Sequence, residues 1–240
     1  MRTVALTKES TTDILENLLK RSLNNYGKFE AAVDDILNKV KTEGDAALFV
    51  YTKEFDKTEI SVDTYKVTEE EIKEAYEAVD PALIDVIRKA LVNIRSYHEK
   101  QRQNSWFTSE TNGTMLGQKV TALERVGVYV PGGKAVYPSS VLMNIVPAKV
   151  AGVDQIVMTT PPEKNGKVNP STLVAAKEAG ADEIYKVGGA QAIGALAYGT
   201  ESIPKVDKIV GPGNIFVALA KKAVYGYVSI DSIAGPSEIL

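Results

Sequence analysis

Cysteine is absent from this sequence of 240 residues, and its absence excludes several kinds of chemistry. Without a thiol the chain can form no disulfide, no thiolate nucleophile and no cysteine-ligated metal site. Histidine occurs once, as His98, beside Glu99 and Lys100 in an expected long helix. We interpret His98 as a solvated helix residue. No Ser–His pair is therefore expected near the glycine turns described below, and a zinc site cannot be built on histidines in this sequence.

Long apolar runs and basic clusters are also missing. No segment approaches the ~20 uninterrupted apolar residues that cross a bilayer. The first 20 residues carry acidic side chains among their leucines, which is unlike a signal peptide or a presequence, so the expected location is the cytoplasm. The net charge is −3 and no basic stripe occurs, so we expect no nucleic-acid or membrane partner. Lys221 and Lys222, in a late helix, are interpreted as a solvated helix face.

The first half of the sequence has mainly helical patterns and no nucleotide-binding signature. Thr68 with Glu71 forms a capping-box pattern, and Asp80 before Pro81 is typical of a helix start. Asn112-Gly113 is a common hairpin turn. These patterns predict helices over 11–20, 29–43, 46–55, from Thr68 onward and over 81–103, a short extended piece near 60–67, and a β-hairpin over 108–123.

After Arg125 short apolar runs alternate with amphipathic segments. Strands joined by helices of this length predict right-handed crossovers and a parallel sheet that is buried on both faces. The fold class is therefore α/β, a parallel-sheet domain preceded by a mainly helical segment. The expected strands are 126–130, 155–160, 183–187, 206–210 and 228–231, and the expected helices are 138–151, 169–179, 190–199 and 214–225.

Glycine-rich turns follow three of these strands, at Pro131–Gly133, Gly188–Gln191 and Gly211–Asn214. Each turn alone is ordinary turn chemistry, but three at the carboxyl edge of one sheet favour a ligand cleft. Two standard nucleotide fingerprints fail. Gly211-Pro212-Gly213 lacks the third glycine of Gly-x-Gly-x-x-Gly, and the run from Gly127 to Ala135 is one residue too long for a P-loop and lacks its hydroxyl.

Side chains must supply much of the affinity in such a cleft. A helix N-terminus stabilises an anion by about 0.3–1 kcal/mol, whereas micromolar binding needs roughly 8 kcal/mol. Tyr129, Gln191 and Asn214 stand at or beside the strand ends and are suitably polar. Each also has a structural alternative: a tyrosine that packs on the sheet, a glutamine exposed on a helix, and an asparagine that caps a helix.

Several long phrases in order resemble the histidinol dehydrogenase family, closely after Glu124 and more loosely before it. They are Arg125–Lys134, Gly188–Ile193, Gly199–Ser202, Val206–Asn214, Ile230-Asp231 and Ala234–Glu238. The resemblance implies oxidation of L-histidinol to L-histidine through the aldehyde, with two NAD molecules reduced and one zinc per active site. It also implies NAD contacts at Tyr129, Gln191 and Asn214, and a substrate contact at Ser237.

The fold implied by the resemblance is an incomplete Rossmann-like domain of aldehyde-dehydrogenase-like architecture. It divides the chain into a helical arm (1–24), the first part of domain one (25–128), the NAD-binding domain (129–234) and a return into domain one (235–240). Family chains continue past this length, and the zinc ligands and the acid–base pair lie in that continuation. We therefore expect no catalytic or metal residue in this chain, no histidinol oxidation by it alone, and doubtful formation of the family homodimer.

Two alternatives stay open at the level of sequence. The chain could be a non-catalytic nucleotide-binding module that kept the fold, or part of a dehydrogenase for another amino alcohol. Most of the residues that would select the substrate are not in this stretch, so the residues here do not separate the three.

Overall fold

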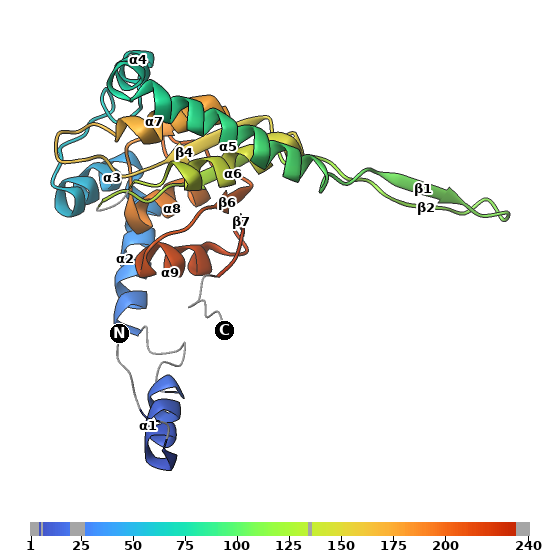
Figure 1. Ribbon diagram of the computed structural model, residues 1–240, viewed down its shortest axis with the longest axis horizontal. Coiled ribbons are helices and arrows are strands. Elements are labelled where there is room, and N and C mark those ends of the chain that lie inside the picture. The colour runs from blue at the N-terminus through green and yellow to red at the C-terminus, as the bar shows by residue number, and fades with distance from the viewer. Residues whose placement is uncertain (1–4, 6, 20–26, 134–135, 234–240) are drawn as a thin grey trace.

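Five parallel strands form the centre of the computed structural model, which describes residues 5, 7–19, 27–133 and 136–233 (Figure 1). The strands lie in the order β5-β4-β3-β6-β7, so the chain winds outward from β3 in one direction and then in the other. This order is that of doubly wound nucleotide-binding sheets, with its reversal between β3 and β6. The bounds are β3 (Arg125–Tyr129), β4 (Gln155–Thr159), β5 (Glu183–Tyr185), β6 (Lys208–Val210) and β7 (Ser229–Ile230).

The α/β class and all five predicted strand positions are confirmed, although four strands (β4, β5, β6 and β7) are shorter than expected. Neighbouring strands pair in parallel register, with Val126 opposite Ile156 and Val128 opposite Met158. Successive side chains point to opposite faces of the sheet, so each strand contributes to two cores. Both cores are apolar because the sheet is covered on both faces.

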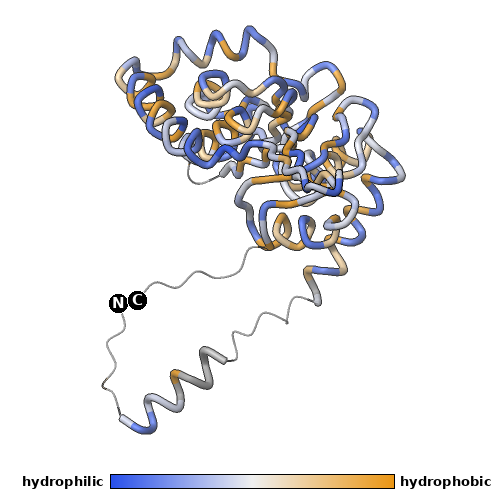
Figure 2. Tube along the Cα trace, turned by 90° about the vertical axis from the view of Figure 1, so that its right-hand side faces the viewer, coloured by the Kyte–Doolittle hydropathy of each residue, from blue (hydrophilic) through white to orange (hydrophobic). Residues whose placement is uncertain are grey.

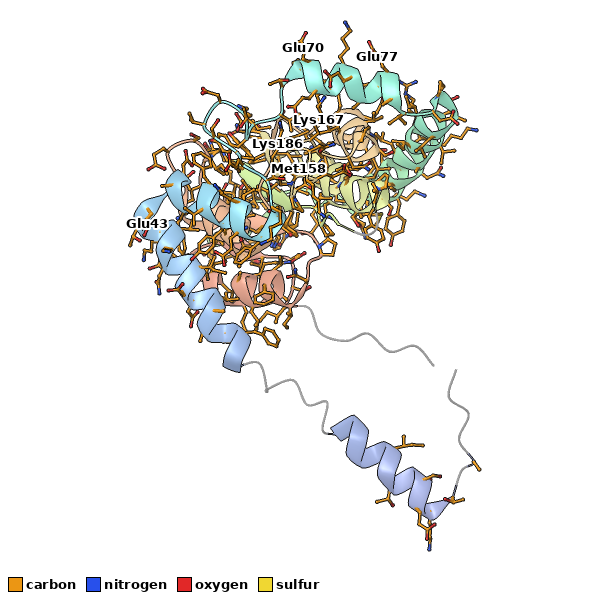
Figure 3. The ribbon with its side chains drawn as sticks, turned by 90° about the vertical axis from the view of Figure 1, so that its left-hand side faces the viewer. Glu43, Glu70, Glu77, Met158, Lys167 and Lys186 are labelled. Atoms are coloured by element: carbon orange, nitrogen blue, oxygen red, sulfur yellow. The ribbon has the colours of Figure 1, made fainter. Side chains whose placement is uncertain are left out.

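Four helices lie directly against the sheet, and the first half of the chain adds helices outside them. Val128, Ile156 and Met158 pack in one core, while Tyr129, Val157 and Ile209 pack in the other. Figure 3 shows Met158 inside the body, and Glu70 and Glu77 projecting from the outer helix α4. The inner helices are α6 (Pro138–Ala151), α7 (Pro170–Ala179), α8 (Gly189–Tyr198) and α9 (Ile215–Val224), and the outer ones are α2 (Gly27–Glu43), α3 (Asp45–Tyr51), α4 (Glu69–Ala78) and α5 (Pro81–Glu99).

The outer helices are divided between the two faces. α2 packs on α8 and α9, whereas α4 packs on α7, and α5 packs on α6 and α7. The helical first half of the chain therefore covers both sides of the sheet (Figure 1). The proposed division between 25–128 and 129–234 stays a prediction, and its boundary falls within β3.

Helix starts follow the cap chemistry that the sequence indicates. Thr68 Oγ1 accepts from the Glu71 amide at 3.2 Å, and Glu71 accepts in return from the Thr68 amide at 3.0 Å. Asp80 Oδ1 accepts from Ala82 N at 2.8 Å, and Asn169 Oδ1 accepts from Ser171 N at 3.0 Å. The predicted starts at these positions are confirmed because each side chain satisfies an amide that the helix leaves free.

Three helical predictions are wrong in their bounds. α1 (Lys8–Leu19) begins three residues early, and α5 ends at Glu99 instead of near Gln103. The segment 46–55 is not one regular helix, since α3 is followed by the π-helical turn η1 (Thr52–Asp56). Near 60–67 only one bridge, between Lys66 and Tyr185, has strand pairing.

The predicted hairpin is confirmed as β1 (Trp106–Ser109) and β2 (Met115–Gln118), and it projects from the body (Figure 1). All eight strand residues are exposed. α1 stands apart from the body in both views, whereas the apolar segments of the sheet and its helices gather together (Figures 1 and 2). No helix in the described ranges is long and apolar enough to cross a membrane.

Truncation of Ile156 tests the importance of the central sheet. Its side chain is fully buried in β4, so Ile156→Ala leaves a cavity and should lower the free energy of unfolding by about 2–5 kcal/mol. Val86→Ala is the control, because Val86 is 58% exposed on α5 and its truncation should change stability by less than about 0.5 kcal/mol. Urea unfolding followed by circular dichroism measures both. Equal effects would contradict a core centred on this sheet.

Candidate functional site

A cavity of about 540 Å³ opens at the carboxyl ends of β3 and β6, where the strand order reverses. Ligands of doubly wound folds bind at this position. Tyr129, Gln191 and Asn214 all line the cavity, so the fold brings together the three residues that the sequence selects. Its other walls come from the turns after the strands, the first turns of α8 and α9, the outer helix α2, and η1 (Thr52–Asp56). They are Ala32, Ile36, Phe55, Asp56, Pro131, Gly132, Pro161, Gly189, Ala190 and Phe216.

A second cavity, of about 430 Å³, continues the first toward β4 and α7. Its walls include Thr160–Lys164, in the turn after β4, and Val168, Asn169 and Thr172 around the start of α7. The residues that line both cavities are Phe55, Asp56, Pro131, Gly132 and Pro161. The two spaces therefore form one cleft in two parts, with those residues at the junction.

Tyr129 ends β3 with its ring in the core and its hydroxyl at the cavity. The side chain is 3% exposed, and the hydroxyl accepts a hydrogen bond from Gly189 N at 3.1 Å. Burial raises the pKa of Tyr129 to about 12, so the phenol is neutral at physiological pH. Tyr129 therefore both packs on the sheet and fixes the turn that begins α8.

Gln191 is buried, whereas its structural alternative was a glutamine exposed on a helix. Its side chain is 1% exposed, so the interpretation as an exposed helix glutamine is wrong. Neither Oε1 nor Nε2 has a hydrogen-bond partner among the described residues, although both atoms are buried. A buried amide without partners costs free energy, and native proteins rarely leave one unmet. The first turn of α8 thus holds, in a residue of the cavity wall, a buried amide donor and acceptor that no described residue uses.

Asn214 has the capping role that the sequence suggests. Its Oδ1 accepts from Val217 N at 3.1 Å at the start of α9. The cap fixes the side chain at the mouth of the cavity, at the point where β6 ends. Capping and ligand contact are compatible, because the cap uses only the oxygen of the amide.

Packing within the protein already explains the glycines of two turns. Gly211 has φ of 120°, and a Cβ there would collide with the carbonyl of Tyr129. A Cβ on Gly188 would lie 2.5 Å from Pro161 Cβ. The turns after β5 and β6 therefore need glycine to approach their neighbours, and it is the side chains positioned by these turns that indicate a ligand.

The interpretation of Lys221 as solvated is wrong. Its side chain is buried, and its Nζ donates to Gly211 O at 2.9 Å and pairs with Asp231. Asp231 Oδ2 in turn accepts from Gly211 N at 2.9 Å. Lys222 does face solvent, where it pairs with Glu30. The helical spacing could have predicted this burial, because Lys221 lies on the same helix face as the buried Val217 and Val224.

Asp56 is a cleft residue that the sequence did not reveal. It ends η1, and the next residue, Lys57, has a left-handed φ of 58°. Its Oδ2 is buried without a hydrogen-bond partner among the described residues, and burial raises the pKa of the carboxyl to about 6. The pattern of residues 46–55 predicts a regular helix and gives no sign that its last turn widens and aims a carboxylate at the cleft.

The remaining residues singled out in the sequence are not found among the described cleft residues. Ser237 falls outside the described residues. His98 is on α5, with Nδ1 2.7 Å from Gln101 Oε1, and it lines neither cavity. Among the described residues no group of three or more His, Cys, Asp or Glu could hold a metal ion. In the segment Gly199–Ser202, Glu201 accepts from Asp45 N at 2.8 Å and Ser202 Oγ donates to Asp45 Oδ2 at 2.7 Å, so this segment links α3 to the connection between α8 and β6.

Known proteins match this chain over most of its length. The family model described as histidinol dehydrogenase matches residues 19–240. Histidinol dehydrogenases of Clostridium acetobutylicum and Bacillus subtilis are 58% and 59% identical to it, over 94% and 92% of this chain. That of Methanocaldococcus jannaschii is 55% identical over 97%. The crystal structure of histidinol dehydrogenase from Elizabethkingia anophelis is similar with a TM-score of 0.83, at 39% identity over 90% of this chain.

The chain spans about half the length of the curated relatives it matches. It covers 52% of the C. acetobutylicum and B. subtilis proteins and 54% of the M. jannaschii protein. It also covers 49% of the E. anophelis chain.

Substitution of the buried Lys221 tests how much its contacts with Asp231 and Gly211 stabilise the turn after β6. Lys221→Met leaves Asp231 without its charge partner and Gly211 O without its donor. We expect a loss of about 2–3 kcal/mol in unfolding free energy, less than for a fully buried pair because Asp231 is partly exposed. Lys222→Met, one residue on, should change stability by less than about 0.5 kcal/mol. Chemical denaturation measures both free energies of unfolding. If Lys221→Met does not lower the free energy of unfolding, the turn is stable without the ion pair.

The raised pKa of Asp56 predicts a pH-dependent stability. The folded state binds this proton more tightly than the unfolded chain, so the ionised carboxylate destabilises the fold as pH rises from about 4 through about 6. Asp56→Asn should therefore stabilise the protein at pH 7.5, by about 1 kcal/mol because solvent screens a partly buried group, and by less at pH 4.5. Among the described residues, the other titratable side chains that line the cleft are Tyr129, Glu163 and Lys164.

Urea unfolding at the two pH values measures this difference. Asp63→Asn is the control, since Asp63 is exposed and lines neither cavity. A gain that is the same at both pH values would show that burial of the Asp56 charge is not its cause.

Proposed function

This chain belongs to the histidinol dehydrogenase family, a family of oxidoreductases in histidine biosynthesis, and we propose that it forms the NAD-binding part of an enzyme that oxidises L-histidinol to L-histidine through the aldehyde. Gln191 carries the proposal. Its buried amide has a donor and an acceptor without partners, and it faces a cavity at the reversal of a doubly wound sheet.

The cleft suits a dinucleotide in size and in shape. Its two parts, of about 540 and 430 Å³, each fall within the range of small-molecule sites. A dinucleotide likewise consists of two nucleotide halves. The junction at Pro131 and Gly132 lets the backbone approach a ligand closely, because neither residue places a long side chain there.

Each proposed contact residue has a distinct task. Gln191 would give a hydrogen bond and accept one, Asn214 would meet the ligand at the end of β6, and Tyr129 would hold the Gly189 turn against it. Phe55 and Phe216 supply apolar surface that removes water from a bound base. NAD, when bound, accepts a hydride from the substrate carbon, and these residues bind and orient it.

Zinc belongs to this proposal only for the complete enzyme. The described residues offer no metal-binding cluster, so they do not fit the ion. L-histidinol is the proposed substrate and the cytoplasm the proposed location. No nucleic-acid or membrane partner is proposed.

Calorimetric titration with NAD tests the contact residues. Gln191→Ala combined with Asn214→Ala removes both amides, and we expect NAD affinity to fall about tenfold or more, since each lost hydrogen bond contributes about 0.5–1.5 kcal/mol. Asp80→Ala is the control. It removes a helix cap of similar strength on α5, away from the cleft, and should leave NAD affinity unchanged. An unchanged affinity in the double variant would remove Gln191 and Asn214 from the site.

A further inference from the structure

Asp56 stands where the two parts of the cleft meet. The residues that line both cavities are Phe55, Asp56, Pro131, Gly132 and Pro161, and Asp56 is the one ionisable side chain among them. Whatever crosses from one cavity to the other therefore passes this carboxylate.

The protein itself makes no use of the inward oxygen of Asp56. Oδ2 is buried, and none of the described residues gives it a hydrogen bond. The backbone nevertheless holds the side chain there, through the π-helical turn η1 and the left-handed Lys57. Non-glycine residues rarely adopt that conformation, and π-helical turns often occur at functional sites.

We propose that Asp56 selects the cofactor: its carboxylate accepts hydrogen bonds from the adenosine ribose hydroxyls of NAD and excludes the phosphorylated ribose of NADP. This inference rests on the proposed binding of a nicotinamide dinucleotide. A carboxylate accepts from both hydroxyls of a vicinal diol, because it has two oxygens and no donor. A ribose phosphate would place about two negative charges beside it instead.

The position of Asp56 favours the adenosine half. Doubly wound folds bind one nucleotide half over each half of the sheet, and an acidic residue in the first half usually receives the ribose. The second cavity lies over β4 and α7, which belong to the first half of this sheet. β4 itself ends in Thr159-Thr160-Pro161, with no acid at the strand end. η1 brings Asp56 to that place from outside the sheet.

Other charges on the described walls of the cleft do not oppose this selection. Among the described lining residues, the other charged side chains are Glu163 and Lys164. Both are exposed, adjacent on the turn after β4 and opposite in sign. Asp56 is thus the charged side chain that lies deepest in the cleft.

Titration of the 240-residue chain with NAD and with NADP, by calorimetry at pH 7.5, tests the proposal. We expect the unsubstituted chain to bind NAD at least about tenfold more tightly than NADP. In Asp56→Asn, NAD affinity should fall about tenfold, NADP affinity should stay level or rise, and the preference should largely disappear. Asp56→Ser, which also lacks the charge, should lose the preference in the same way. Asp63→Asn, an exposed charge change outside the cleft, should keep it.

The outcomes separate the inference from the function on which it rests. Equal losses for NAD and NADP in Asp56→Asn would overturn it, because Asp56 would then contact a part that both cofactors share. Unchanged affinities in both Asp56 variants would overturn it as well. If the unsubstituted chain binds neither dinucleotide, the proposed cofactor fails and the inference with it. A thermal melt of each variant establishes that the protein titrated is folded.

Discussion

Burial of one parallel sheet on both faces is the constraint from which the rest of this structure follows. Each strand alternates its side chains between two apolar cores, so helices must cover both sides. Right-handed crossovers can meet that demand by winding outward from β3 in two directions. The reversal leaves the turns after β3 and β6 diverging at one edge of the sheet, and the cleft opens there. A cavity at this edge is thus a product of the topology, and the side chains around it decide what it can hold.

Two of the residues that line the cleft also hold its turns, and a buried ion pair outside the cleft holds a third backbone position. Tyr129 fixes the start of α8, Asn214 caps α9, and Lys221 with Asp231 fastens both backbone groups of Gly211. A site built in this way is rigid, because a contact residue cannot move without breaking a bond of the fold. Gln191 is the exception, since its amide has no partner within the described protein. Its hydrogen bonds are available without loss of any bond within the protein.

Patterns within a few residues of sequence predicted many of the helix starts and strand positions. They could not predict features that depend on contacts between distant segments. The capping oxygens of Thr68, Asp80 and Asn169 act within three residues of chain, so sequence alone placed those helix starts. Strand positions followed from apolar runs, but their order depends on long-range pairing that no local pattern contains. Tyr129, Gln191 and Asn214 could be selected because each adjoins a strand end. Asp56 could not, since it reaches the cleft from a π-helical turn some seventy residues before β3.

The hydrogen bonds between α3 and the segment Gly199–Ser202 help to determine where Asp56 lies. Glu201 and Ser202 grip Asp45 at the first turn of α3, and η1 continues that helix to Asp56 at the cleft. α3 and η1 therefore form one continuous helical segment. Its first residue is held by hydrogen bonds from the segment that follows α8, and its last residue is Asp56 at the cleft. The position of Asp56 in the cleft wall therefore depends on hydrogen bonds made at the other end of this helical segment.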